Sequence, residues 1–383
     1  MSKTDNKKLD EKVDGAIAYS ENFFKNNKEF HLNYEKTAEN YLVSSGSILV
    51  DDRIGGGFHS GLLRFTGCNE GGKTAEALEI LKNGLNNISK ARGLYIKAEG
   101  RLSENVRLRS GLRLVHDPKD WADGTCLVFE CNVFDTVFDF IRGLFKNNKD
   151  KNKYFIVIDS MDGLLLKSDL DKDTGDAPKV AGGALLSSDF LKRVSLGMSK
   201  FGHLCIMISQ VRSKVSIDPY AKADTNNQTS ASGGNASLHY PDWIFEFQRQ
   251  YQDDFILEDP AAKFSSKNKK IGHYAKVRIC KSTNETTGQI IRYPIIYGRT
   301  NGRSIWVERE IVEMLVMWGF VEKTKAGSSW YVFDPEFRKF CEGEKVELPK
   351  SIQGLKKIYE YFESNENSTT VARNFVAIEI LKK

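Results

Sequence analysis

The sequence predicts an α/β fold in which a mostly parallel central sheet is flanked by helices. Between about residues 60 and 210, short apolar runs typical of strands alternate with longer segments that have helical apolar spacing. The run 154–158 is continuously apolar, which is typical of a strand buried on both faces of a sheet. A glycine-rich segment separates the first strand of this series from its first helix. Together these features favour a sheet sandwiched between helices.

The composition is typical of a folded protein with a sizeable core. Of the 383 residues, 40% are hydrophobic and 28% are charged, and the formal net charge is +5. This mild excess of positive charge permits nucleic-acid binding without requiring it. The six cysteines form no C-x-x-C pair, so we expect buried thiols in a reducing compartment rather than a metal site or disulfides. Because no apolar run reaches membrane-spanning length and residues 1–14 are polar, we expect a cytoplasmic protein with no membrane partner.

The chain is predicted to have three parts. Residues 1–45 are rich in lysine, asparagine and glutamate and have weak helical spacing. They are expected to form an N-terminal arm that either packs on a neighbouring subunit or is partly disordered. Residues 46–300 form the predicted core, and residues 301–383 form a small α+β C-terminal domain.

The first motif of the core is Gly67-Cys68-Asn69-Glu70-Gly71-Gly72-Lys73-Thr74, which follows the phosphate-binding spacing G-x-x-x-x-G-K-[ST]. Residues 62–66 before it have the pattern of a strand, and residues 74–87 after it have the pattern of a helix. With a strand before it and a helix after it, the loop would turn its N–H groups and the helix N-terminus toward phosphate oxygens. The alternative is a chance glycine-rich turn, which would have neither the strand nor the helix beside it. Lys73 would reach the β- and γ-phosphates and the Thr74 hydroxyl would ligate Mg²⁺. The motif therefore predicts a site for a nucleoside triphosphate.

Three later strands are predicted to end in polar residues at one edge of the sheet. Strand 93–98 ends at Glu99, strand 154–158 ends at Asp159, and strand 204–208 is followed by Gln210. Because ligands of such sheets bind at the carboxyl ends of the strands, we expect these side chains to face one crevice. Asp159 would hold the Mg²⁺ shell, Glu99 would deprotonate the attacking water, and Gln210 would contact the γ-phosphate. From spacing alone, Glu99 and Gln210 could equally be ordinary solvated or capping residues.

The connections include two polar segments that are predicted to be functional loops. The first spans residues 167–183, and a helix follows it to about residue 201. The second, residues 213–235, has no apolar pattern and is too long for an ordinary connection in a compact domain. Its small residues and the cations Arg212 and Lys214 could grip a phosphodiester backbone, although a surface loop without a role is the alternative.

Further strands are expected at residues 243–248, 275–281 and 290–297, the first two joined by a lysine-bearing loop. The C-terminal domain is expected to begin near residue 305 with a helix, followed by a strand at 330–333 and one or two terminal helices.

Taken together, these residues resemble the bacterial RecA recombinases and their phage relatives over about residues 43–330. Residues 98–99 are similar to the site of the family's catalytic glutamate, and residues 158–160 are similar to its second ATP motif. Residues 208–212 resemble the strand and glutamine that couple ATP to DNA in the family. The end of the second polar loop, Gly233-Gly234-Asn235-Ala236, is the most diagnostic, because few other ATPases carry it at this place. The resemblance implies a divergent member with a RecA-like P-loop ATPase core and two DNA-binding loops, 167–183 and 213–235.

The resemblance also implies roles for residues that spacing alone would not single out. Lys281 would reach across a subunit interface toward the neighbour's γ-phosphate, although the position of a second such lysine is Thr283 here. Tyr297 and Gly298 would contact adenine, while Val106 stands where the family has a second stacking aromatic residue. The implied DNA contacts are Ser188, Lys192, Arg193, Arg212, Lys214, Gly233, Gly234 and Asn235.

The activity that the resemblance implies is that of an ATP-dependent DNA recombinase in recombination and repair. Such a protein is a DNA-dependent ATPase that uses ATP and Mg²⁺, assembles as a helical homo-oligomer on single-stranded DNA, and pairs it with double-stranded DNA. Single-strand-binding or loader proteins would be further partners. Two alternatives share the same core: a hexameric DNA helicase, and a recombination mediator that binds ATP without exchanging strands.

Overall fold

The computed structural model describes residues 15–26, 41–100, 102–170, 180–213, 229–231, 236–259 and 262–381. The chain divides into two compact units, residues 1–39 and 40–383. In the first unit the described part is a single helix, α1 (Gly15–Asn26), on which the apolar side chains of Ile17, Tyr19 and Phe23 are exposed. Within the described ranges, no helix is long and apolar enough to cross a bilayer.

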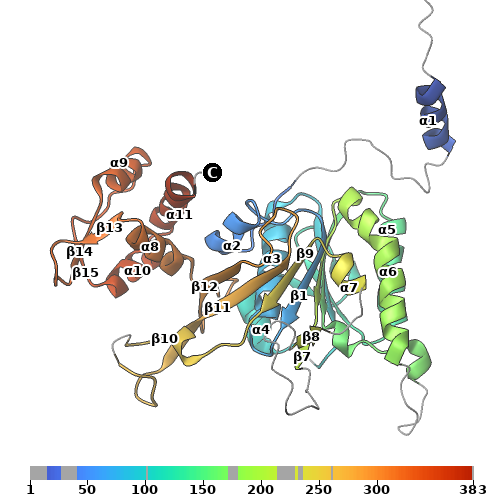
Figure 1. The fold of residues 1–383 in the computed structure, drawn as a ribbon, viewed down its shortest axis with the longest axis horizontal. Helices are drawn as coiled ribbons and strands as arrows, with labels where there is room; N and C mark the ends of the chain where they lie inside the picture. Colours follow the sequence, from blue (N-terminus) through green and yellow to red (C-terminus); the bar gives the residue numbers. More distant parts are fainter. Residues whose placement is uncertain are drawn as a thin grey trace, which may run out of the picture. The chain divides into compact units, whose positions relative to one another are not determined.

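The second unit is built around a mostly parallel sheet (Figure 1). The spatial order of its strands is β10 (Phe255–Leu257), β11 (Lys270–Lys281), β9 (Trp243–Phe247), β1 (Gly61–Gly67), β6 (Leu204–Ile208), β5 (Lys153–Asp159), β2 (Ala91–Lys97), β4 (Cys126–Glu130) and β3 (Leu114–Val115), while β12 (Ile290–Ile296) pairs with β11. Strands β9 to β3 pair in parallel, and β10, β11 and β12 add an antiparallel edge. The predicted fold class is confirmed.

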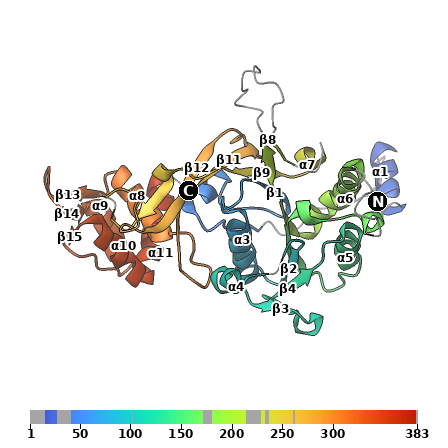
Figure 2. The ribbon, with the colours of Figure 1, turned by 90° about the horizontal axis from the view of Figure 1, so that it is seen from below.

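Helices cover both faces of this sheet (Figure 2). On one face lie α3 (Lys73–Asn87), the short α2 (Ile48–Arg53) and α4 (Glu104–Ser110), and on the other lie α5 (Phe134–Lys146) and α6 (Val180–Phe201). Neighbouring residues of β1 pack on opposite faces of the sheet. Leu63 packs in the cluster under α3, and Leu62 packs with α5 and α6. Burial on both faces explains why these strands are continuously apolar.

Short elements follow the strands at the edge where the polar loops begin. The 3-10 turns Met161–Gly163 and Lys167–Asp169 come after β5, and α6 already begins at Val180, inside the predicted first loop. After β6, β7 (Val211–Ser213) pairs with β8 (Thr229–Ala231), and α7 (Ala236–His239) leads into β9. The predicted loop residues 171–179, 214–228 and 232–235 lie outside the described residues.

The C-terminal part has its own apolar cluster and a small antiparallel sheet. Its elements are α8 (Val307–Met317), β13 (Val321–Lys323), β14 (Trp330–Phe333), α9 (Pro335–Gly343), β15 (Ile352–Gln353), α10 (Leu355–Ser364), α11 (Glu366–Phe375) and a final turn of π-helix, Val376–Ile380. Ile48 of α2 is buried in this C-terminal cluster rather than in the cluster between the sheet and α3. The first helix of the core therefore packs against the C-terminal helices.

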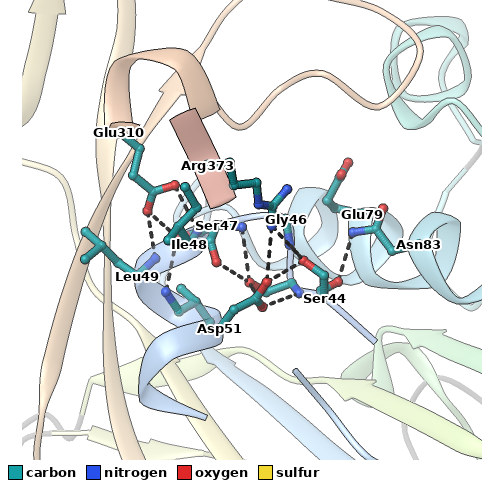
Figure 3. Close-up of polar contacts among 12 residues, drawn as sticks. Ser44, Gly46, Ser47, Ile48, Leu49, Asp51, Glu79, Asn83, Glu310 and Arg373 are labelled. Carbon is teal, nitrogen blue, oxygen red and sulfur yellow. Dashed lines mark hydrogen bonds and ion pairs between the residues drawn. The ribbon is translucent and has the colours of Figure 1, made fainter. Parts of the chain in front are cut away.

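Polar contacts reinforce this junction (Figure 3). Glu310 on α8 accepts a hydrogen bond from the Ser47 hydroxyl at 2.6 Å and from the backbone N–H groups of Ile48 and Leu49 at 3.0 and 3.1 Å. Helix α2 therefore receives part of its N-terminal hydrogen bonding from a residue about 260 positions later in the chain.

The six cysteines lie in different surroundings, and not all of them are buried. Cys126, Cys205 and Cys341 lie in apolar surroundings, whereas Cys68 and Cys280 are exposed. The expectation of burial is wrong for these two because Cys68 lies in the glycine-rich loop and Cys280 lies next to the end of β11.

Candidate nucleotide-binding site

The glycine-rich loop is held close against β9, which explains its glycines. Gly67 ends β1 with φ +135°, and a Cβ placed there would lie 2.1 Å from the carbonyl oxygen of Phe247. A Cβ on Gly71 would lie 3.2 Å from both the Cys68 oxygen and the Phe247 Cβ. The remaining loop residues Cys68, Asn69 and Glu70 are exposed, and Gly72 forms the N-cap of α3 in a left-handed conformation. The approach at Gly67 leaves no room for a side chain, and the one at Gly71 is tight enough that its neighbours would have to shift.

Lys73, the first residue of α3, points back into this loop. Its Nζ donates hydrogen bonds to the carbonyl oxygens of Gly67 at 2.9 Å and Cys68 at 2.6 Å. Burial lowers the pKa of Lys73, and the surrounding charges, including the carboxylates of Asp159 and Glu99, act in the opposite direction. The ammonium is therefore held where it could exchange loop carbonyls for the oxygens of a bound phosphate.

Asp159 is the centre of a hydrogen-bonded group at the carboxyl end of β5. Its Oδ2 accepts from the Thr74 hydroxyl at 3.2 Å and the Tyr95 hydroxyl at 2.7 Å, and Lys97 Nζ lies 3.4 Å away. Burial and the neighbouring Asp159 raise the pKa of Tyr95, so the phenol stays a donor. Tyr95 and Lys97 escaped the sequence analysis, although the expected pairing of neighbouring strands places Lys97 in register with Asp159.

The same group is suited to a magnesium ion. A threonine hydroxyl and a carboxylate are hard oxygen ligands, and Mg²⁺ is usually bound by one or two such protein groups together with substrate phosphates and water. Thr74 and Asp159 provide this donor pair beside the loop. Within the described residues, no cluster of three or more His, Cys, Asp and Glu side chains forms a separate metal site.

Glu99 lies beside Asp159, as expected from the ends of two paired strands. Its Oε1 accepts a hydrogen bond from the Ser160 hydroxyl at 2.6 Å. Gly163 lies so close that a Cβ there would be 2.4 Å from Glu99 Cγ. The carboxylate is thus restrained from two sides by the segment that follows β5, with one oxygen hydrogen-bonded.

Gln210, which follows β6, connects to this edge through a residue that the sequence analysis missed. Its backbone N–H donates to Asp162 Oδ2 at 2.6 Å. Next to it, the side chain of Arg64 on β1 donates from Nε to the Ser209 hydroxyl at 3.1 Å. Arg64 is only 2% exposed, and burial lowers its pKa to about 10 against the opposing influence of Asp162. No sequence motif marks either charged residue, because tertiary contacts alone bring them together.

A cleft of about 510 Å³ extends from the glycine-rich loop toward β12. Val106 of α4 and Tyr297 both line it, and His273 Nδ1 lies 2.8 Å from the Tyr297 hydroxyl. Gly298 follows with φ +80° and does not itself line the cleft. The polar wall residues that sequence reasoning did not identify include Arg109, Gln250, Lys270 and His273. The cleft is lined by polar residues of the loop and by the apolar side chains of Leu78, Val106 and Ile295.

Lys281 does not line this cleft of its own chain. Its Nζ donates to the carbonyl oxygens of His239 and Pro241, the latter at 2.7 Å, at the end of α7. The lysine is therefore tied to the segment that follows the second polar loop.

The predicted DNA contacts divide into described and undescribed residues. On α6, Ser188 is half-buried while Lys192 and Arg193 are exposed, and Arg193 forms a surface ion pair with Asp189 at 2.9 Å. The backbone of Arg212 lies in β7. Lys214, Gly233, Gly234 and Asn235 lie outside the described residues.

No family model matches the chain. Individual relatives do, and they are RecA proteins. The chain is 24% identical over 303 residues to the RecA protein of Syntrophobacter fumaroxidans, covering 77% of this chain and 75% of that protein. It is 22% identical over 328 residues to that of Gluconobacter oxydans, covering 85% and 83%, and 22% identical over 338 residues to that of Rickettsia canadensis, covering 87% and 86%. Together with the fold, these long alignments at low identity support a divergent member of the RecA family.

Proposed function

We propose that this protein is an ATP-dependent DNA recombinase that assembles on single-stranded DNA, pairs it with double-stranded DNA and exchanges strands in recombination and repair. The observation that carries the proposal is the group of side chains at the carboxyl edge of the sheet. There Thr74, Asp159 and Glu99 meet beside the loop lysine Lys73, in a chain of the RecA family.

In this proposal the cleft holds ATP with its phosphates on the glycine-rich loop. The loop N–H groups and the N-terminus of α3 would face the phosphates, and Lys73 would bind the β- and γ-phosphates. Thr74 and Asp159 would hold Mg²⁺, which neutralises charge on the phosphate oxygens when it is bound. Tyr297 and Val106 would lie against the base, and with one aromatic residue instead of two the grip on the base would be loose.

Glu99 is the proposed general base. Its carboxylate would accept a proton from a water molecule as that water attacks the γ-phosphorus, and the bond to the bridging oxygen would break to give ADP and phosphate. Ser160 would orient the carboxylate through the hydrogen bond to Oε1. Lys73 would stabilise the charge that develops on the transferred phosphoryl group.

Gln210 is the proposed link between ATP and DNA, since it lies between this edge and the segment that begins with Arg212. Lys192 and Arg193 are exposed, and together with Ser188 and the residues of the second loop they would contact the DNA backbone. Lys281 lines no part of its own cleft, which suits the proposal that it acts at the ATP site of a neighbouring subunit in a helical assembly. Loader or single-strand-binding proteins are proposed as further partners.

The test is the substitution Glu99→Gln, which keeps the shape of the side chain but removes the base. We expect ATP turnover to fall by about 10²–10⁴-fold while ATP-dependent binding to single-stranded DNA persists. The matched control is Glu130→Gln, because Glu130 ends the neighbouring strand β4 and is exposed. Turnover that survives in the Glu99 variant would show that another group is the base.

A further inference from the structure

The 3-10 turn Met161–Gly163 is in contact with several functional segments at once. It lies between β5 and the first polar loop, and its Gly163 is packed against Glu99. Its Asp162 accepts the backbone N–H of Gln210 at 2.6 Å. One short turn therefore touches the proposed general base and the residue that begins the path to the second loop.

Asp162 also lies in the field of two buried cations. Arg64 is 2% exposed on the central strand β1, and a guanidinium so deeply buried requires a compensating negative charge. Asp162 contributes that compensation, since it acts to raise the pKa of Arg64 against desolvation. Because Arg64 also donates to the Ser209 hydroxyl, the charge of Asp162 acts on a side chain that links the middle of β1 to the residue after β6.

The second cation is Lys73. Asp162 acts to raise the pKa of Lys73 as well, so the two charges interact across the phosphate-binding edge. A triphosphate bound at Lys73 adds negative charge there. Its negative charge would repel Asp162, whose Oδ2 holds the Gln210 N–H at 2.6 Å. The residue that holds the Gln210 backbone is thus sensitive to whether the loop is occupied.

We infer that the turn Met161–Gly163 couples the nucleotide site to the DNA-binding loops, and that Asp162 is its positioning residue. This inference rests on the proposed function. Asp162 touches neither nucleotide nor DNA in this account. It fixes the backbone of Gln210 in a position that depends on the charge at Lys73, and through Gln210 it biases the second loop.

The test measures coupling rather than activity. The dissociation constant for single-stranded DNA is measured with and without a slowly hydrolysed ATP analogue, and the ratio of the two values is the coupling factor. Asp162→Asn keeps an oxygen acceptor for the Gln210 N–H but removes the charge, and Asp162→Ala removes both. The matched control is Asp139→Asn on α5, an exposed carboxylate that lies 3.6 Å from Arg142.

We expect Asp162→Asn to lower the coupling factor by about tenfold, within the usual range of coupling between two sites. Nucleotide affinity in the absence of DNA should stay within about threefold of wild type, a loss too small to account for the change in coupling. Because coupling is reciprocal, the ability of DNA to tighten nucleotide binding should fall by the same factor. Asp162→Ala should lower the factor at least as much, and Asp139→Asn should leave it unchanged.

Wild-type coupling in both Asp162 variants would overturn the inference. A parallel loss of nucleotide affinity with and without DNA would also overturn it, because that pattern indicates a structural role only. If the wild-type protein itself shows no ATP-dependent DNA binding, the proposed function fails and the inference fails with it. That result appears in the unsubstituted chain and is therefore distinct from a failure of Asp162 alone.

Discussion

Gly67 is the residue at which the candidate site is most sensitive to a single added methyl group. Its φ is +135°, and a Cβ would lie 2.1 Å from the Phe247 oxygen and 2.8 Å from the Phe247 carbonyl carbon. We expect Gly67→Ala to lower the free energy of unfolding by about 2–4 kcal/mol, from backbone strain and overpacking together. Urea denaturation followed by circular dichroism measures this change, and nucleotide affinity should fall as the loop moves off β9.

Gly143 is the matched control for this substitution. It lies within α5, and a Cβ there would meet nothing within 4 Å. Gly143→Ala should raise the free energy of unfolding by about 0.5–1 kcal/mol, because alanine loses less backbone entropy in a helix. Equal effects of the two substitutions would contradict the account of the loop.

At the residue scale, the sequence indicated candidate site residues that lie at the end of a strand or in the glycine-rich loop. Lys73 and Thr74 could be proposed as site residues from loop spacing, and Asp159 and Glu99 from the rule that parallel strands end at one edge. In the structure Thr74 donates to Asp159, Glu99 accepts from Ser160 next to Asp159, and Lys73 precedes Thr74 at the start of α3. Asp162 and Arg64 could not be identified, since only the tertiary pairing of β1, β5 and β6 makes them neighbours.

At the scale of elements, the start of β6 depends on a buried neutral histidine. His203 is fully buried, its Nδ1 accepts the backbone N–H of Tyr154 on β5 at 3.1 Å, and its ring stacks on Phe145 of α5 with centroids 4.4 Å apart. Burial lowers the pKa of His203 to about 3. The folded protein therefore excludes a proton that the unfolded chain binds below about pH 6.5.

This exclusion predicts a pH dependence of stability. Between about pH 6.5 and about pH 3 the unfolded state binds more protons at His203 than the folded state does. The contribution of His203 to the free energy of unfolding therefore falls as the pH falls. At about pH 5 the free energy of unfolding should be lower than at neutral pH by about 2 kcal/mol because of this residue. The substitution His203→Asn keeps an acceptor near the position of Nδ1 but cannot be protonated there. It should remove this part of the dependence of the free energy of unfolding on pH, as measured by urea unfolding between about pH 3 and about pH 6.5. An unchanged slope would show that His203 charges in the folded state.

Element types followed from periodicity better than element lengths did. The strand predicted at 275–281 begins at Lys270, because pairing with β10 and β12 extends it beyond its apolar stretch. The helix after the first polar loop begins at Val180, inside the segment predicted as loop. Lys270, Gly272 and His273 interrupt the apolar pattern of the strand, and pairing with its neighbours overrides this weak local preference. At the start of the helix, Gly182 and Gly183 are poor helix formers, so the sequence pattern places the start too late.

At the scale of the whole molecule, the N-terminal end of the core and the C-terminal helices are joined through Glu310. Its carboxylate satisfies three donors on and before α2, namely the Ser47 hydroxyl and the N–H groups of Ile48 and Leu49. We expect Glu310→Ala to lower the free energy of unfolding by about 3 kcal/mol, because buried donors lose their acceptor. Glu310→Gln should cost less, since one oxygen remains, and Glu322→Ala on the exposed part of β13 should have little effect. Thermal and urea unfolding compare the three variants, and equal effects would exclude a structural role for this junction.

The overall architecture could be predicted from the sequence because alternating strands and helices restrict the topology to a few parallel arrangements. The junction at Glu310 could not, since its partners lie about 260 residues away and no pattern marks them. The family was recognisable from a few motifs, and alignments of 21–25% identity over most of the chain agree with it.

The measurement that tests the central claim most directly is ATP hydrolysis by the full chain at low salt, with and without single-stranded DNA, with the same samples viewed by electron microscopy. We predict that DNA raises the rate by about tenfold or more, in the range expected for two coupled sites, and that helical filaments form with ATP. Affinity for DNA should fall steeply as salt is added, because each neutralised phosphate releases counterions. A rate that does not respond to DNA, or closed rings in place of filaments, would contradict the account.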